Sequence, residues 1–257
     1  MNRDAPIVCD ERADGVTRLS FNQPETRNAL DSHLIDTLID RLDAFSRNDE
    51  QRVLVITGSG SSFCAGGNLQ EMADIADAPS GQQRDYLWRH IHRIPRAFER
   101  LEKPVIAAVN GAAYGAGMDI ALMCDLRIAA RSARLCSSYI NLGLVAGDGG
   151  AFFLARLVGI ERSLELLWTG RVVGAEEALA LGLFGSVVDD AELQDAAIGL
   201  ALRIAAQPPE PIRMMKRAVY DVPSTNLRSH LDMVASHMAV LYDSEAFQTR
   251  MKNLGTK

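Results

Sequence analysis

Two loops made almost entirely of small residues, each directly behind a short apolar run, most strongly constrain the fold of this 257-residue chain. The first loop, FCAGGN at residues 63–68, follows the apolar run 53–57. The second loop, NGAAYGAG at residues 110–117, follows the run 105–109. Short runs rich in Val and Ile and closed by glycine are typical of buried strands. The chain is therefore expected to be an α/β protein in which strands pass through glycine loops into helices.

A helix is expected behind each loop, over residues 69–76 and 118–124. Glycine allows a backbone to approach a ligand closely, and the unbonded N–H groups at a helix start favour negative charge. Two such loops from separate units can point two N–H donors at one developing oxyanion, which needs no cofactor. The alternative, that these glycines serve only tight turns and close helix packing, stays open at this point.

Two familiar glycine motifs do not fit the second loop. A Walker loop requires Lys followed by Ser or Thr after its last glycine, whereas Met118 and Asp119 stand there. A dinucleotide fingerprint that starts at Gly115 requires Gly or Ala at its sixth position, which Ile120 occupies. The second loop therefore predicts neither kind of nucleotide site.

The order and spacing of several motifs make the chain similar to the crotonase superfamily, the enoyl-CoA hydratase/isomerase group. The resemblance covers nearly the whole chain, from about Ile7 onward, and five individually weak motifs occur in the family's order. Two later stretches, 154–170 and 174–178, also match in order and spacing. The five motifs are NQPETRNAL at 22–30 (similar to the family's coenzyme A loop), FCAGGN with LQEM at 63–72, KPVIAAVNG at 103–111, CDLRIA at 124–129 and LGLVAGDGG at 142–150.

The resemblance implies a crotonase-like spiral of β-β-α units over residues 1–200. A C-terminal helical region over residues 201–257 would then mediate trimerisation and close the pocket. The implied enzyme holds the oxygen of an acyl-CoA thioester in an oxyanion hole formed by Gly67 and Ala116. Coenzyme A is then part of the substrate, and no separate cofactor is expected. Further implied acyl-CoA-binding residues are Thr26, Arg27, Ala29, Ala65, Gly66, Asn68, Gly115, Phe247 and Lys252. A surface arginine after a turn is the alternative interpretation of Arg27.

The chain departs from the family at its acid–base positions. The resemblance implies two glutamates, but Asp119 occupies the first position and Tyr139 the second. Tyrosine is a poor base at neutral pH because its unperturbed pKa is about 10. Asp148 can supply the missing carboxylate, although the alternative that it caps the following helix, over residues 149–158, stays open. A charge inside an apolar helix is costly to bury without a purpose. Asp119 is therefore expected to be the principal acid–base group, with Asp148 assisting and Tyr139 orienting substrate or water.

Enoyl-CoA hydratase or isomerase activity, as used in fatty acid metabolism, is the function that the resemblance implies. Decarboxylation, C–C hydrolysis and dehalogenation stay open because these reactions of the superfamily share the oxyanion hole. A non-catalytic acyl-CoA-binding subunit that has lost the acid–base pair is the alternative from another functional class.

The C-terminal part, from residue 207 onward, is expected to be helical and is rich in methionine. An apolar stripe at helical spacing commonly packs against its own domain. The resemblance implies instead that the C-terminal helices pack over a neighbouring subunit, in a homotrimer or in a homohexamer built as a dimer of trimers. The stripe consists of Leu227, Leu231, Val234, Met238 and Leu241.

Composition excludes several classes of partner. The formal net charge of −6 disfavours nucleic acid, because neutralising phosphates requires excess Lys and Arg. The four cysteines form no Cys-x-x-Cys pair and lie near no histidine group, so reduced thiols, a cytoplasmic location and no metal site are expected.

The first ten residues lack the apolar segment of a signal peptide. Residues 105–124 have membrane-helix length, but their turn residues favour a strand, a loop and a buried helix, so no membrane insertion is expected.

Local patterns predict the other elements. Residues 15–21 alternate as a half-exposed strand does, and Ser32 is expected to cap a helix that ends at Arg47. Residues 79–81 predict a mobile loop, and residues 86–101 an amphipathic helix bent or interrupted at Pro95. His90 and His92 point to different sides of that helix, so we expect solvent-facing roles for both and no metal pair.

Overall fold

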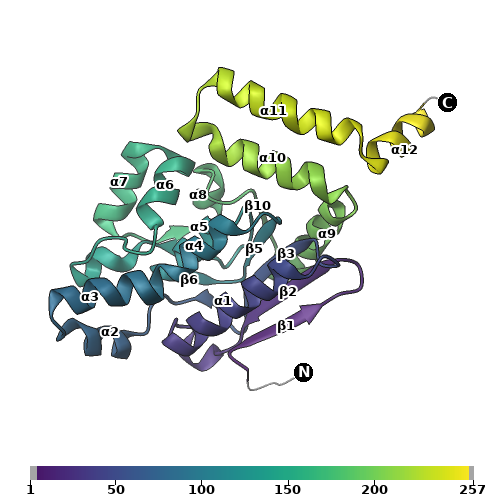
Figure 1. The fold of residues 1–257 in the computed structure, drawn as a ribbon. Helices are drawn as coiled ribbons and strands as arrows, with labels where there is room; N and C mark the ends of the chain where they lie inside the picture. The colour runs from purple at the N-terminus through teal and green to yellow at the C-terminus, as the bar shows by residue number, and fades with distance from the viewer. Residues whose placement is uncertain (1–4, 255–257) are drawn as a thin grey trace.

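The computed structural model describes residues 5–254 and shows two β-sheets with helices packed around them (Figure 1). The larger sheet has the strand order β1 (Ile7–Glu11), β2 (Val16–Phe21), β3 (Val53–Gly58), β5 (Val105–Val109), β7 (Leu126–Ala130), β10 (Ser186–Val188). The smaller sheet has the order β4 (Ser62–Cys64), β6 (Ala112–Tyr114), β8 (Arg134–Cys136), β9 (Val173–Gly174). Within the described residues, the β1–β2 and β8–β9 pairs are antiparallel and the other pairs are parallel.

A β-β-α unit recurs along the chain and joins the two sheets. β3 lies in the large sheet and β4 in the small one, and α2 (Leu69–Ala76) follows them. β5, β6 and α5 (Ala116–Met123) repeat this pattern, and β7, β8 and the 3₁₀ turn η3 (Ser138–Leu142) repeat it again. Each new unit places its strands beside those of the unit before it. The expected spiral of β-β-α units is confirmed.

The central strands are buried on both faces, which explains their continuous apolar sequence. Alternate residues of β3 enter different clusters: Leu54 and Ile56 join the main core, and Val53 and Val55 join a second one. The second cluster is closed by α9 (Leu193–Ala205), which packs on β3, β5 and β7. α9 packs closely because small residues repeat along its inner face: Ala197, Ala201 and Ala205.

The remaining helices before residue 206 surround the sheets (Figure 1). α1 and α4 pack on each other, and α6 packs on both α5 and α7. Their bounds are α1 (Ser32–Arg47), α3 (Ser80–Tyr86), α4 (Arg93–Arg100), α6 (Gly150–Val158), α7 (Ile160–Thr169) and α8 (Ala175–Ala180). Shorter turns are η1 (Pro24–Thr26), the π-helical segment η2 (Leu87–Ile91), η4 (Asp190–Glu192) and η5 (Val222–Ser224).

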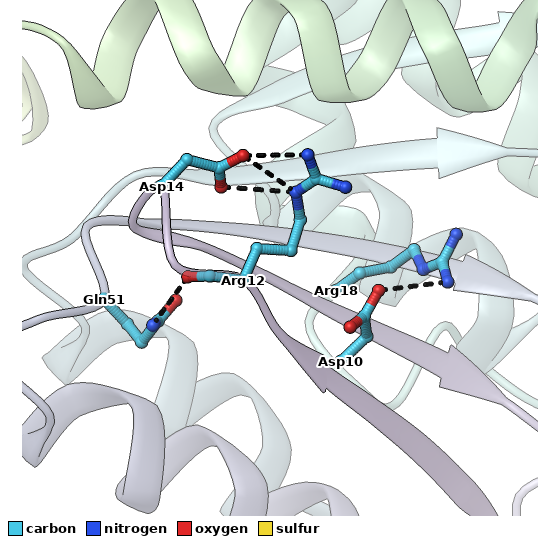
Figure 2. Close-up of polar contacts among 5 residues, drawn as sticks. All are labelled: Asp10, Arg12, Asp14, Arg18 and Gln51. Atoms are coloured by element: carbon cyan, nitrogen blue, oxygen red, sulfur yellow. Dashed lines mark hydrogen bonds and ion pairs between the residues drawn. The ribbon is translucent and has the colours of Figure 1, made fainter.

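Polar side chains hold the β1–β2 hairpin at one edge of the large sheet (Figure 2). Arg12 pairs with Asp14 at 2.8 Å within the turn, and Arg18 pairs across the strands with Asp10 at 3.3 Å. The Gln51 side chain donates to the Arg12 carbonyl at 3.1 Å, which ties the turn to the segment before β3. Charged side chains on an edge strand also oppose unwanted strand pairing.

Three local expectations about helices need correction. The N-cap of α1 is Asp31, whose carboxylate accepts from Leu34 N at 2.7 Å, and not Ser32. α3 begins at Ser80 directly after Pro79, so a helix occupies the place of the expected loop. The helical run over residues 80–100 is interrupted by the π-helical segment η2 and not at Pro95. Pro95 lies in the first turn of α4, where a backbone N–H has no intrahelical acceptor, so the missing N–H of proline removes no helical hydrogen bond.

The C-terminal helices α10 (Pro209–Asp221), α11 (Leu227–Tyr242) and α12 (Glu245–Leu254) contain no buried residue. α11 packs on α10, and α12 extends away from the sheets at the described C-terminal end (Figure 1). The predicted stripe is largely uncovered: Leu227 is 73% exposed, Leu231 56% and Met238 42%. The interpretation that this stripe packs against its own domain is therefore wrong for the single chain.

The apolar run 105–124 forms the buried strand β5 and the fully buried helix α5, as the sequence predicted, but the loop expected between them contains the short strand β6. Among the described residues, no helix is long and apolar enough to cross a membrane. The four cysteines are free thiols, and burial raises the pKa of Cys64 to about 12. Cys64, Cys124 and Cys136 are buried, and Cys9 is half-buried.

Candidate active site

The two glycine loops meet because the strands that lead into them are neighbours. β4 and β6 pair in parallel, so their carboxyl ends lie at the same edge of the small sheet. Gly66 has φ of +98°, and a β-carbon there would lie 2.8 Å from the Tyr114 carbonyl oxygen and 3.7 Å from Ala116 N. Any side chain at Gly66 would force the loops apart, which explains the glycine.

Two backbone amides at this contact are open as hydrogen-bond donors. Leu30 bridges Gly67 by donating to Gly66 O at 2.7 Å and accepting from Asn68 N at 2.9 Å, so the N–H of Gly67 points away from Leu30. Ala116 is the first residue of α5, and the N–H of a first helical residue has no acceptor within its helix. Within residues 5–254, neither amide donates to a protein acceptor. Both are therefore able to bind one oxyanion.

The implied coenzyme A loop lies beside the first glycine loop. Ala65 N donates to the Arg27 carbonyl at 3.0 Å, so the segment 27–30 runs along residues 65–68. Thr26 and Arg27 are exposed, and Ala29 is half-buried. Thr26, Arg27 and Ala29 therefore lie near Ala65 and Gly66, an arrangement that residues of one ligand site require.

The buried Asn28, which was not singled out from the sequence, fixes that loop in place. Its side-chain amide donates to Ser62 O at 2.9 Å and to Phe63 O at 3.2 Å, and its oxygen accepts from Gln23 N. Its φ is +58°, a left-handed conformation that asparagine adopts more readily than most residues. An asparagine directly after a turn was the only signal in the sequence.

Asn68, a predicted acyl-CoA contact, caps a helix with its side chain. It accepts from Gln70 N at 2.9 Å and from Glu71 N at 3.2 Å at the start of α2. Glu71 then accepts from Ser32 N and from the Ser32 hydroxyl at 2.8 Å, which ties α2 to α1. The side chain of Asn68 thus positions the loop that carries Gly67.

Asp119 lies in the first turn of α5, one turn after Ala116, and is 1% exposed. The backbone of Gly150 hydrogen-bonds to its carboxyl group. A β-carbon on Gly150 would lie 2.1 Å from Asp119 Oδ1, so only glycine fits there. Gly149 and Gly150, which follow Asp148 in the sequence, therefore bring α6 into contact with the Asp119 carboxyl group.

The three predicted acid–base residues meet at one point. The Tyr139 hydroxyl lies 2.7 Å from Asp119 Oδ2 and 2.9 Å from Asp148 Oδ2. Tyr139 comes from η3, and Asp148 from the segment before α6. α6 starts at Gly150 without a side-chain cap at its N-cap residue, Gly149, so the alternative that Asp148 caps this helix is wrong.

Burial dominates the electrostatics of this cluster. It raises the pKa of Asp119 to about 7; the hydrogen bond from Tyr139 lowers this pKa, and the charge of Asp148 raises it. Burial also raises the pKa of Asp148, while Tyr139 and the charge of His92 lower it. Burial, followed by the two carboxylates, raises the pKa of Tyr139, so its phenol stays protonated. A carboxyl group that titrates near neutral pH is suited to proton transfer.

His92 supports the segment that carries Asp148. Its Nε2 lies 2.9 Å from the Gly147 carbonyl oxygen, and this nitrogen must carry the proton because a carbonyl only accepts. His92 is half-buried, so the expectation that it faces solvent is wrong. His90 is exposed, so the expectation that it faces solvent is confirmed, and its ring stacks on Tyr86. The two-residue spacing gave no signal of this contact, because it joins residues 55 positions apart.

Phe247 and Lys252 lie on α12, far from α2 and α5 of the same chain (Figure 1). Phe247 packs edge-on against Tyr242 at 5.0 Å between ring centres. The expectation that both contact the ligand stays a prediction. Elsewhere in the described residues, no group of three or more His, Cys, Asp or Glu side chains is placed to hold a metal ion.

The chain is similar to a known family and to proteins of known sequence and structure. The model of the family described as enoyl-CoA hydratase/isomerase matches residues 11–253. The 1,2-epoxyphenylacetyl-CoA isomerase of Escherichia coli K12 is 36% identical over 85% of this chain and 84% of its own length. The short-chain-enoyl-CoA hydratase of Clostridium acetobutylicum is 33% identical over 92% and 86%. The enoyl-CoA hydratase of Bacillus anthracis is similar in structure, with a TM-score of 0.89, 32% identity, and coverage of 98% and 96%.

Proposed function

The chain belongs to the enoyl-CoA hydratase/isomerase family of the crotonase superfamily and is an enzyme of hydratase/isomerase type, and on this basis we propose that it moves the double bond of an enoyl-CoA thioester. The proposed reaction converts a 3-enoyl-CoA into a 2-enoyl-CoA. It removes a proton from the α-carbon and adds one at the γ-carbon, and it needs no cofactor.

The proposed intermediate is an enolate whose oxygen is bound by the amides of Gly67 and Ala116. Two fixed N–H donors that meet at one point stabilise the charge that develops on that oxygen. Their meeting at the edge of the small sheet, without protein acceptors in the described chain, supports this role. The exposed loop with Thr26 and Arg27, together with Ala29, Ala65, Gly66 and Gly115, is the proposed contact surface for coenzyme A.

One observation favours isomerisation over hydration: both carboxyl groups point at the Tyr139 hydroxyl. Water addition requires a water molecule held between an acid and a base. In this site the phenol oxygen occupies the point at which Asp119 and Asp148 converge. Transfer of a proton between two carbons requires an acid and a base but no water, and the pair supplies both.

A two-substrate assay tests this function. We expect isomerisation of a 3-enoyl-CoA to exceed hydration of the matching 2-enoyl-CoA in kcat/KM. Asp119→Asn keeps the side-chain shape but removes the ionisable group, so it should lower kcat about 10²- to 10⁴-fold with acyl-CoA binding retained. Faster hydration than isomerisation would contradict the proposal. Unchanged turnover of Asp119→Asn would exclude Asp119 from the chemistry.

We further propose that the active form is a homotrimer, alone or as a dimer of trimers, assembled through residues 201–257. The exposed apolar face of α10–α12 supports this, because a monomer seldom leaves so many large apolar residues in water. In such an assembly, α12 of one copy can reach the acyl-CoA site of the next. Phe247 and Lys252 then keep their proposed ligand contacts, although from a neighbouring copy.

A further inference from the structure

The Tyr139 hydroxyl contacts two carboxyl oxygens but carries only one proton. When it donates that proton to one carboxylate, its oxygen can only accept a hydrogen bond from the other group. The second contact is therefore a hydrogen bond only if the other carboxyl is protonated. Asp119 and Asp148 then share one proton and one negative charge, with the phenol between them.

The surroundings decide which carboxyl holds the proton at rest. Asp119 is 1% exposed inside an apolar helix, and the pKa of its carboxyl group is raised to about 7. Asp148 is 9% exposed, and the charge of His92 favours its ionised form. In the resting enzyme, Asp119 therefore donates to the Tyr139 oxygen, and Tyr139 donates to the Asp148 carboxylate.

We propose that Tyr139 is a proton relay that returns a proton from Asp148 to Asp119 after each turnover. The inference rests on the isomerase function proposed above and adds to it the route by which the site resets. Tyr139 acts through the two carboxyl groups and does not itself need to contact the substrate. It stays neutral throughout, because it gives up its own proton as it receives another.

The cycle balances in protons and electrons. The Asp148 carboxylate takes the α-proton, and the electron pair of that C–H bond moves onto the thioester oxygen as an enolate. Asp119 gives its proton to the γ-carbon; a C–H bond forms there, the C=O bond is restored, and the double bond lies between the α- and β-carbons. Asp148 is now protonated and Asp119 ionised. Asp148 passes its proton to the Tyr139 oxygen, Tyr139 passes its own to Asp119, and the resting state returns.

Tyr139→Phe tests the relay because it removes the hydroxyl and keeps the ring. The variant should complete its first turnover at a rate within about threefold of the unaltered enzyme and then slow about 10- to 100-fold, which corresponds to the lower range of proton-transfer effects. Rapid mixing should therefore show a burst of one product per site. Added imidazole, a small proton carrier, should raise the slow phase with its concentration and leave the unaltered enzyme unchanged.

Tyr220→Phe is the matched control, because its hydroxyl also donates to a carboxylate, Asp125, at 2.9 Å, and reaches no second carboxylate within residues 5–254. It should show neither a burst nor a response to imidazole. An equal loss in both phases of Tyr139→Phe, without rescue, would overturn the relay and leave the isomerase function intact. Steady-state turnover equal to the unaltered enzyme would overturn it as well. Absence of isomerisation in the unaltered enzyme would overturn the proposed function itself.

A measurement on the unaltered chain covers the case in which Tyr139→Phe does not fold. The infrared spectrum at pH 6 should contain the C=O band of a protonated buried carboxyl group, and Asp119→Asn should remove it. A spectrum without such a band would overturn the relay, since the mechanism requires one shared proton before substrate binds.

Discussion

At the scale of single residues, Asp119 links the proposed catalysis to stability. Its carboxyl pKa is about 7 in the folded chain, against an ordinary value of 3.8, and burial is the main cause. Folding therefore favours the protonated form, and the resulting stability is fully present below about pH 4 and lost as the pH rises through 7. The fold therefore favours the protonated carboxyl that donates a proton in the proposed reaction, and the ionised form left after that step costs free energy.

Asp119→Asn should remove that pH dependence. At pH 8 we expect the variant to be more stable than the unaltered chain by up to about 4 kcal/mol, from about 1.4 kcal/mol per pKa unit. The difference should shrink towards pH 4, where Asp119 is protonated in both the folded and the unfolded chain. Urea unfolding of both proteins at pH 5 and pH 8 measures this. An equal difference in the free energy of unfolding at both values would contradict the expectation.

His92 tunes the same site from the junction of η2 and α4. His92→Phe removes the contact with the Gly147 carbonyl and the charge that favours ionised Asp148, so the pKa of Asp148 should rise. Because Asp148 must be ionised to take a proton, the acidic limb of the kcat profile should move to higher pH. Asp119 and Tyr139, the other titratable groups against Asp148, are unchanged.

We expect kcat at neutral pH to fall about five- to tenfold in His92→Phe, consistent with loss of about 1 kcal/mol from one hydrogen bond. His90→Phe is the control, since His90 lies on the same helical run and is exposed. Its pH profile should match that of the unaltered enzyme. A shift of the same size in both variants would mean that the helical run as a whole, and not the contact to Gly147, sets the profile.

At the scale of elements, the position of α5 against β4 sets the distance between the two proposed oxyanion donors. A β-carbon on Gly117 would lie 2.2 Å from the Cys64 carbonyl oxygen. Gly117→Ala must therefore push α5 away from β4 and move Ala116 relative to Gly67. Backbone cannot give way as a flexible side chain can, so both the fold and the site are affected.

Gly117→Ala should lower the free energy of unfolding by about 1–3 kcal/mol, as overpacking commonly does, and reduce kcat more than it raises KM. Gly199→Ala is the control. Gly199 lies on α9, which also packs on a sheet, and the nearest atom to the new β-carbon there is Arg203 Nη1 at 3.9 Å. It should stabilise the fold by about 0.5–1 kcal/mol through helix propensity. Destabilisation by both variants alike would contradict the packing argument.

At the scale of the whole molecule, the exposed face of α10–α12 is the feature that the single chain does not explain. We expect light scattering at micromolar concentration to give the mass of a trimer or of a dimer of trimers. The double variant Leu227→Asp with Leu231→Asp places two charges on that face and should shift the mass towards the monomer. Ser229→Asp adds a charge between these two positions but on another side of α11, and should leave the mass unchanged. A monomeric unaltered chain would end the proposal.

The sequence by itself determined several elements and the two glycine loops, but not the short strands β4 and β6 inside those loops. The runs at β3 and β5 and the helix over residues 69–76 follow from patterns that neighbouring residues carry along the chain. The spacing of apolar residues and the conformational freedom of glycine act within a few positions, so they can be read locally. The position of Asp119 one turn after Ala116 is of the same kind, since both lie on one helix.

Only the tertiary structure decided how distant segments combine at the site. Tyr139 and Asp119 are 20 positions apart, and whether Asp148 caps a helix or meets that pair depends on how α6 packs against α5. The contact of His92 with Gly147 and the exposure of the α11 stripe likewise depend on packing. A local pattern states which face of an element is apolar but not what covers it, because the partner comes from elsewhere in the chain or from another copy.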